Sequence, residues 1–351
     1  MASTVSERTA AHRPVSTDRR DLIVALASVW LAGGLFMDGW AHSHVPSLET
    51  FFTPWHGVLY SGYAALAISL VPARLWRGRP EGAVRTWVPA GYGLGLLGAI
   101  LFAAGGVFDM LWHITFGIEV NLEALLSPPH LLLLTAGSLM IATPVRAAAA
   151  KRDRRDGPAS PVGAAEVPVL ISATSATAVA AFFLDYLSPF TDAPAASSGY
   201  GNGQALGMAQ YLTYSVLVVA AVLFVWSRLG RVPFGLVTFV VAAASVPNGV
   251  FSDFENLSAQ LWPLLGAVLA DLVVQRVQGG VARRAGTVPL AIGVVVPLLV
   301  WPTHLLGVRL SLGVAWSLEL WSGVVVLTVL AGAVLGGLFL PFTTRDPETG
   351  R

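Results

Sequence analysis

Hydrophobic residues occur along this chain in long runs that are separated by short polar segments. A transmembrane helix needs about 20 consecutive, mostly apolar residues. Ten runs of that size lie near residues 21–42, 54–76, 88–113, 128–149, 167–187, 206–228, 233–253, 257–277, 288–307 and 314–340. The pattern predicts an all-α fold, a polytopic transmembrane helical bundle whose ten spans form five antiparallel hairpins.

Composition supports a lipid bilayer as the main partner. Hydrophobic residues make up 55% of the 351 residues and charged residues only 12%, well outside the usual range of soluble domains. The formal net charge of +1 gives no indication of nucleic-acid binding. The chain has no cysteine, which excludes disulfides, thiolate metal sites and cysteine nucleophiles. The nucleotide-binding Walker sequence and the common hydrolase motifs are also absent.

Basic residues indicate the orientation, because Arg and Lys are retained in short cytoplasmic loops. Of the 21 basic residues, 20 fall in the tails and in alternate loops, and only Arg309 falls on the other side. Nearly all of them are Arg, as expected for a GC-rich bacterial gene. The predicted location is therefore the plasma membrane of a bacterium, with both termini cytoplasmic.

The same pattern predicts a division of the chain into units. Residues 1–20 and 341–351 form cytoplasmic tails, and residues 150–166, rich in charge, Pro, Gly and Ala, form a cytoplasmic linker. The linker separates a four-helix unit, residues 21–149, from a six-helix unit, residues 167–340.

The first two hairpins share a polar pattern, D-x3-H, then a loop, then E-x3-[ST]-P-x-H. The first hairpin supplies Asp38, His42, Glu49, Thr53, Pro54 and His56, and the second supplies Asp109, His113, Glu123, Ser127, Pro128 and His130. Five polar residue types at matched spacing in so apolar a chain indicate that a helical hairpin was duplicated.

The spacing predicts that each hairpin gathers its polar groups at one point. Asp and His at positions i and i+4 share one face of a helix. Thr53 or Ser127 is a good N-cap, and the proline after it suits the first helical position. His56 and His130 then lie in the first turn of the returning helix, at the depth of the preceding Asp and His.

Imidazole and carboxylate groups together are ligands for Zn, Cu(II), Fe and Mn. Ionisable groups within spans are costly and are usually functional. We therefore expect a transition-metal site near the extracytoplasmic face, with copper favoured and zinc or iron as alternatives, for metal handling or redox chemistry. The predicted ligands are Asp38, His42, His56, Asp109, His113, His130, Glu49 and Glu123. No catalytic residue is assigned, and whether the protein is an enzyme stays open.

Three other interpretations of these residues remain. They could form a buried hydrogen-bond network that fixes hairpin packing, a proton or ion pathway in a coupled transporter, or axial ligands of a b-type haem. Transporters are often built from repeats, although these repeats are parallel rather than inverted.

The D-x3-H pattern followed by a His on the next helix resembles the copper-site motif in the C subunit of particulate methane and ammonia monooxygenases. That resemblance covers about twenty residues at a time and implies that Asp109, His113 and His130 bind copper. It implies the same role for Asp38, His42 and His56.

Other polar residues are interpreted as structural. Asp185 holds the acidic position of a hairpin that offers no histidine, so it is interpreted as a degenerate copy or as polar packing. His304 is expected to pair with Arg309, and Asp271 with Arg276.

Overall fold

The computed structural model describes residues 13–45, 52–72, 75, 87–117, 122–154, 166–198, 201–280 and 287–340. This part of the chain is helical and contains no strand, which confirms the all-α prediction. The helices are α1 (Asp18–His44), α2 (Pro54–Leu70), α4 (Gly93–Phe116), α5 (Leu122–Leu126), α6 (Pro128–Ile141), α7 (Thr143–Arg152), α8 (Val167–Phe183), η2 (Asp185–Leu187), α9 (Pro189–Asp192), η3 (Pro194–Ala196), α10 (Asn202–Leu229), α11 (Leu236–Ser245), η4 (Pro247–Ser252), α12 (Leu257–Gly279), α13 (Thr287–Ser311) and α14 (Leu318–Leu338).

Seven helical segments are long and apolar enough to cross a membrane: α1, α4, α6 with α7, α10, α12, α13 and α14. Two shorter apolar segments are α8 and the stretch Leu236–Ser252, which includes α11. Helix α2 has 17 residues and so is about 26 Å long, slightly short of the ~30 Å hydrocarbon core. Seven of the ten predicted spans thus have a helix that is long and apolar enough to cross a membrane, and the other three spans stay predictions.

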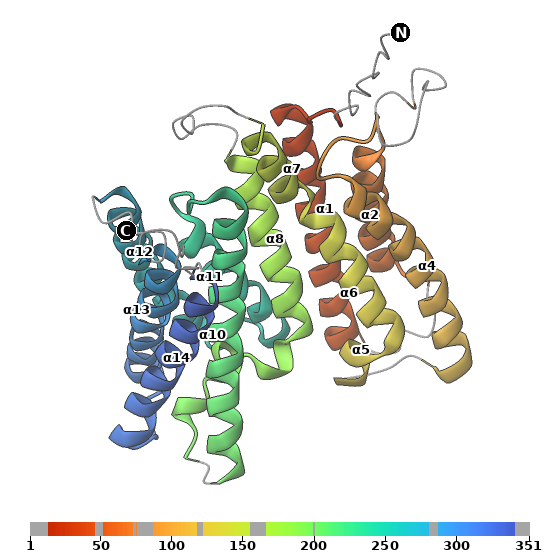
Figure 1. Cartoon of the computed structure of the whole chain (residues 1–351). Helices are drawn as coiled ribbons and strands as arrows, with labels where there is room; N and C mark the ends of the chain where they lie inside the picture. Colours follow the sequence, from red (N-terminus) through yellow and green to blue (C-terminus); the bar gives the residue numbers. More distant parts are fainter. Residues whose placement is uncertain are drawn as a thin grey trace, which may run out of the picture.

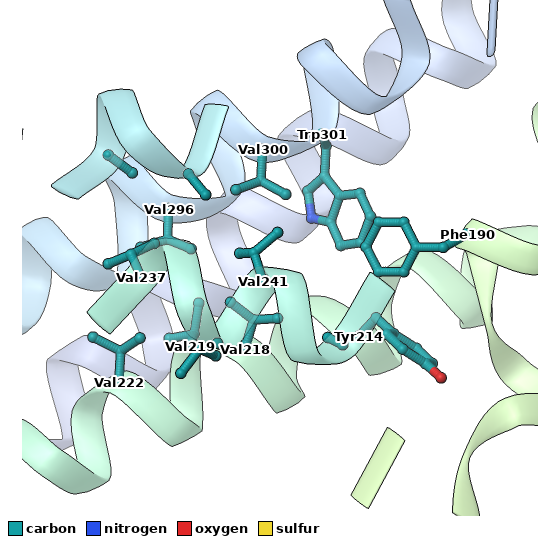
Figure 2. Packing of buried hydrophobic residues seen from close by; sticks show 14 of the residues in the cluster. Phe190, Tyr214, Val218, Val219, Val222, Val237, Val241, Val296, Val300 and Trp301 are labelled. Atoms are coloured by element: carbon teal, nitrogen blue, oxygen red, sulfur yellow. The ribbon is translucent and has the colours of Figure 1, made fainter. Parts of the chain in front are cut away.

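Buried apolar side chains form two clusters, and helix α8 contributes to both. One cluster lies among α8 and α10 to α14, where Val237 and Val241 of α11 lie between valines of α10 and valines of α13 (Figure 2). The other lies among α1, α2, α4, α6 and the last turns of α8. In Figure 1 these two groups of helices stand side by side, with α8 between them. Most of the predicted linker 150–166 lies outside the described residues.

Ion pairs and carbonyl contacts hold together the Arg- and Lys-rich end, the upper end in Figure 1. Lys151 Nζ lies 2.6 Å from carboxylate oxygens of both Asp18 and Asp21. Arg20 donates to the Leu70 and Val71 carbonyls at the end of α2, where backbone acceptors are unsatisfied by the helix itself. These contacts tie the beginning of α1 to α7 and to the end of α2.

Two structural pairings expected from the sequence are wrong. Asp271 does not pair with Arg276 but accepts hydrogen bonds from the backbone N–H groups of Val237 and Thr238. These N–H groups belong to the first turn of α11 and have no partner within the helix. His304 does not pair with Arg309 either. It is fully buried, with Nδ1 2.9 Å from the Ala259 carbonyl oxygen and Nε2 3.1 Å from the Tyr211 hydroxyl.

Candidate metal centre

The first cluster of polar residues, triad one, consists of Asp38 and His42 in the last two turns of α1 and His56 in the first turn of α2. Asp38 Oδ2 lies 3.8 Å from His42 Nε2 and 3.4 Å from His56 Nε2. Asp38 and His56 are buried, each with 8% of its surface exposed. A potential ligand atom of each residue lies within 4.8 Å of the other two, as the i, i+4 spacing predicts.

The second cluster, triad two, has the same arrangement on the next pair of helices. Asp109 and His113 lie near the end of α4, and His130 lies in the first turn of α6. Asp109 Oδ1 is 3.4 Å from His113 Nε2 and 3.3 Å from His130 Nε2. Asp109 is more deeply buried than Asp38, with 2% of its surface exposed.

Close helix packing holds each triad together. A Cβ atom added at Gly62 of α2 would lie 2.8 Å from the Leu31 backbone of α1. A Cβ atom at Gly98 of α4 would lie 2.6 Å from the Ala136 carbonyl oxygen of α6. Both separations are shorter than real side chains allow, so glycine permits the backbones to approach, as is common between membrane helices.

Hydroxyl groups at the helix starts orient the two histidines of the returning helices. Thr53 Oγ1 lies 3.1 Å from His56 Nδ1, and Ser127 Oγ lies 2.7 Å from His130 Nδ1. In both cases the other ring nitrogen, Nε2, faces the aspartate. Thr53 also accepts from the His56 backbone N–H and so caps α2, as predicted. Ser127 is at the N-cap position of α6 but makes no such capping bond.

The histidine of α4 is held by a backbone group instead. His113 Nδ1 lies 3.2 Å from the Gly117 carbonyl oxygen. A carbonyl only accepts, so Nδ1 must carry the proton and donate, which leaves a lone pair on Nε2 of the neutral ring. That lone pair faces a carboxylate oxygen of Asp109. Two electron-rich atoms at this separation need a cation between them, either a metal ion or a proton.

Both triads line one cavity of about 620 Å³. The end of α1 and the beginning of α6, which carry triad residues, are the lower ends of these helices in Figure 1. The carboxyl groups of Asp38 and Asp109 are near enough to interact electrostatically, and so are the imidazoles of His42 and His113. The structure thus brings the six predicted Asp and His residues together at one place, from two hairpins that are separate in sequence.

The two predicted glutamates cannot be compared with the triads. Glu49 lies outside the described residues, and for Glu123 only the backbone, in α5, is described. His44, which follows His42 on α1, is not part of either triad. Its ring stacks on Trp40 and lies 3.6 Å from Asp253.

Four further polar residues of the cavity were not among the predicted ligands: Ser43, Tyr60, Asp185 and Tyr186. Tyr60 lies one turn after His56 and interacts electrostatically with both Asp38 and Asp109. Its hydroxyl packs so closely on α4 that a Cβ atom at Gly106 would lie 2.8 Å away. The second hairpin has Leu134 at the matching position. Tyr60 is therefore not part of the pattern that the two hairpins share, and a comparison of the hairpins does not identify it. Its i+4 spacing from His56 was the available signal.

Asp185, interpreted from the sequence as a degenerate copy or as packing, also lines the cavity. It follows α8 in the short helix η2, and its Oδ1 is buried without a hydrogen-bond partner among the described residues. The acidic position that it shares with Asp38 and Asp109 was a signal for this placement. The absence of a histidine nearby in sequence concealed it.

Chemically, each triad offers one oxygen and two nitrogen ligands around a common point. The N···O separations of 3.3 to 3.8 Å are longer than most hydrogen bonds. They are close to the ligand-to-ligand distance of about 3.3 to 3.4 Å expected for a tetrahedral ion with bonds of 2.0–2.1 Å. The two groups could therefore each hold a metal ion.

Comparisons with known proteins add no family to this description. No family model matches the chain, and neither the search of curated proteins nor the search of solved structures found a match. The function is therefore inferred from the geometry of the two triads and of the cavity that both of them line.

Proposed function

We propose that this integral membrane protein binds a transition metal ion at each triad, near the extracytoplasmic face, and uses the bound metal for metal handling or redox chemistry. The proposed ligands are Asp38, His42 and His56 in one site and Asp109, His113 and His130 in the other. The observation that carries this proposal is the convergence of two imidazole Nε2 atoms on one carboxylate in each triad, at distances that suit metal ligands.

The groups behind the ligands also support a metal. Histidines that bind metals nearly always donate their other ring nitrogen to an oxygen atom, which fixes the ring and its tautomer. Three of the four histidines here, His56, His113 and His130, have an oxygen partner at Nδ1. A packing network would satisfy the same atoms, but it would not require Nε2 of two rings to face one carboxylate.

Haem is a poorer fit than a simple ion. Two axial ligands must approach haem iron from opposite faces of a wide macrocycle. Within each triad both imidazoles instead approach the same carboxylate, with ring centroids 5.7 Å apart in triad one and 5.8 Å apart in triad two. A single ion fits between these groups, whereas a macrocycle does not.

The acidic residues at the other end of the bundle favour a metal site that is used from one face of the membrane over a carrier that moves ions across the membrane. A carrier needs a second set of ligands at the other end of the bundle. Among the described acidic residues at the Arg- and Lys-rich end, Asp18 and Asp21 pair with Lys151 and Glu166 pairs with Arg231. Those carboxylates are engaged in holding helices together and do not gather with histidines.

Copper is the first candidate, with zinc or iron next. Imidazole and carboxylate suit all three metals, and the likeness of the D-x3-H motif to the monooxygenase copper site favours copper. Three protein ligands leave one position of a tetrahedral ion open toward the cavity, as in catalytic rather than structural sites. Glu49 and Glu123, from the adjoining loops, remain proposed as ligands that take this fourth position when no other ligand fills it.

Elemental analysis of the purified protein tests the proposal. We expect one metal ion per triad, with half of the metal lost in His42→Ala/His56→Ala and the other half lost in His113→Ala/His130→Ala. His44→Ala is the matched control, since this histidine lies beside triad one but outside it, and its metal content should equal that of the wild type. Unchanged metal content in both double variants would reject these ligands. An absorption spectrum with a Soret band would establish haem instead.

A further inference from the structure

The cavity that holds the triads extends well beyond them into the bundle. On α1 its lining runs from His42 back to Leu31, and on α6 it runs from His130 to Ile141. Each stretch covers 12 residues of helix, and the 11 steps between its ends amount to about 16 Å at 1.5 Å per residue. That length is about half of the ~30 Å thickness of the hydrocarbon core of a bilayer.

The cavity is polar at one end and apolar along the rest of its length. Its carboxylate and imidazole groups, those of the two triads and Asp185, lie at the ends of α1, α4 and α8 and at the beginnings of α2 and α6. The deeper walls are formed by apolar residues and one glycine: Leu31, Leu59, Phe102, Leu133, Gly137 and Ile141. A small polar metabolite would leave this deeper part unfilled.

We propose that the cavity binds a single-chain amphiphile, with an anionic carboxylate head at the metal-bearing triads and an unbranched apolar tail directed toward Leu31 and Ile141. This inference rests on the proposed function, because the head is assigned from the open position that three protein ligands leave on each ion.

Charge favours an anionic head. A divalent ion bound by one carboxylate and two neutral imidazoles leaves one excess positive charge per triad. Two such charges in one cavity repel each other. An ionised Asp185 offsets one of them, and an anionic group near the metals offsets the other. A carboxylate oxygen is also an ordinary ligand of these metals. It therefore offsets charge and completes coordination at the same time.

The shape of the cavity determines which apolar tails can bind. A bilayer is about as apolar as the leucine-lined wall, so transfer of a tail from lipid to cavity gains little from the hydrophobic effect. The head then supplies most of the affinity, and the length and width of the cavity limit which tails can accompany it. Dodecanoic acid is a suitable probe, because its extended chain is comparable in length to the apolar part of the cavity.

Photo-crosslinking in lipid nanodiscs tests the inference with the full-length, metal-loaded protein. The probe is dodecanoic acid with a diazirine at the tail end, and the labelled residues are mapped by peptide mass spectrometry. We expect labelling near Leu31 and in the Gly137–Ile141 segment, competed by unlabelled dodecanoic acid and not by dodecanol. Removal of the metal with a chelator should reduce the labelling at least tenfold.

Gly137→Leu should block the deep end of the cavity, because a Cβ atom there meets only the Phe102 ring, at 3.6 Å, and a longer side chain extends past it. Deep labelling should fall at least tenfold while metal content stays that of the wild type. Gly33→Leu is the matched control on α1, where an added Cβ atom meets nothing within 4 Å. If Gly137→Leu fails to fold, Leu31→Trp narrows the cavity from the opposite wall.

Labelling and metal content together distinguish a protein that binds no amphiphile from a protein that binds no metal. Metal bound by the wild type, together with labelling that is not saturable or lies only on lipid-facing residues, would overturn the amphiphile and leave the metal sites intact. Deep labelling that persists unchanged after chelation would overturn the assignment of the head to the metal. A wild type that binds no metal would reject the proposed function itself.

Discussion

The two triads use the same residue types with the same Asp-to-His spacing on their first helix, but they differ in burial and in support. In triad two, Asp109 has 2% of its surface exposed and its two N···O distances are 3.4 and 3.3 Å. In triad one, Asp38 has 8% exposed, the distances are 3.8 and 3.4 Å, and His42 is the most exposed histidine of the six-residue set. Triad two is therefore the more preorganised site, and triad one the more accessible one.

The difference in burial and distances shows that one local sequence pattern can give two different sites. The helix spacing brings the ligands together in both hairpins, and the neighbours decide how tightly they are held. In triad one, Thr53 caps the helix and orients His56 with one hydroxyl group. In triad two, Ser127 acts only on His130, and the Gly117 carbonyl holds His113.

The largest expected effect comes from removing a shared carboxylate. Asp109→Ala should abolish the tighter phase of a metal titration, and Asp38→Ala should abolish the weaker phase, because each aspartate faces both histidines of its triad. The loss should exceed the ~10–100-fold that removal of a supporting residue costs. Metal titration followed by calorimetry measures both phases. If both variants lost the same phase, the two triads would form one site and the comparison would fail.

An intermediate effect is expected from the hydroxyl groups. Ser127→Ala should weaken metal binding at triad two by ~10–100-fold without changing helix capping. Thr53→Ala should weaken triad one similarly and also lower the free energy of unfolding by about 0.5–2 kcal/mol, because it removes the cap of α2.

Metal titration and thermal unfolding of the metal-free protein separate these two consequences. Thr53→Ser, which keeps the hydroxyl group, is the matched control. Equal stability losses in Ser127→Ala and Thr53→Ala would contradict the assigned difference between the two hydroxyl groups.

The smallest effect is expected at Tyr60, which occurs only in the first hairpin. Its side chain lines the cavity and interacts electrostatically with both carboxylates, so Tyr60→Phe should change metal affinity by no more than about tenfold, an effect comparable to one net hydrogen bond of about 0.5–1.5 kcal/mol. The two phases of the titration should change together, because the side chain interacts with both Asp38 and Asp109. Leu134→Ala, at the matching position on α6, is the control and should leave both phases in place. A change confined to one phase would show that Tyr60 serves one triad only.

Much of the candidate site follows from local rules. The i, i+4 spacing of Asp and His places them on one face of a helix, and the residue pair Thr-Pro or Ser-Pro marks the start of the returning helix. These rules predicted that Asp38, His42 and His56 would meet, and that Asp109, His113 and His130 would meet. They also predicted an all-helical chain, since apolar runs of about 20 residues have few other stable solutions in lipid.

Local rules failed where a partner is distant in sequence. His304 bonds to Tyr211, 93 positions away, and Asp271 caps a helix that begins more than 30 positions earlier. The sequence alone predicts that His304 and Asp271 pair with the nearest arginine on the same segment of the chain. The same limit applies to Asp185, whose place in the cavity depends on how α8 packs against α1.

The sequence by itself determined the helical character of the chain, the residues of each triad and the turns that begin the returning helices, because spacing along a helix fixes which side chains share a face. Only the tertiary structure decided that the two triads share one cavity, that Tyr60 also lines it and that its lining on α1 runs about 16 Å from His42 to Leu31. These features depend on the approach of separate helices, and that approach is set by glycines and packed side chains whose partners are hundreds of atoms away along the chain.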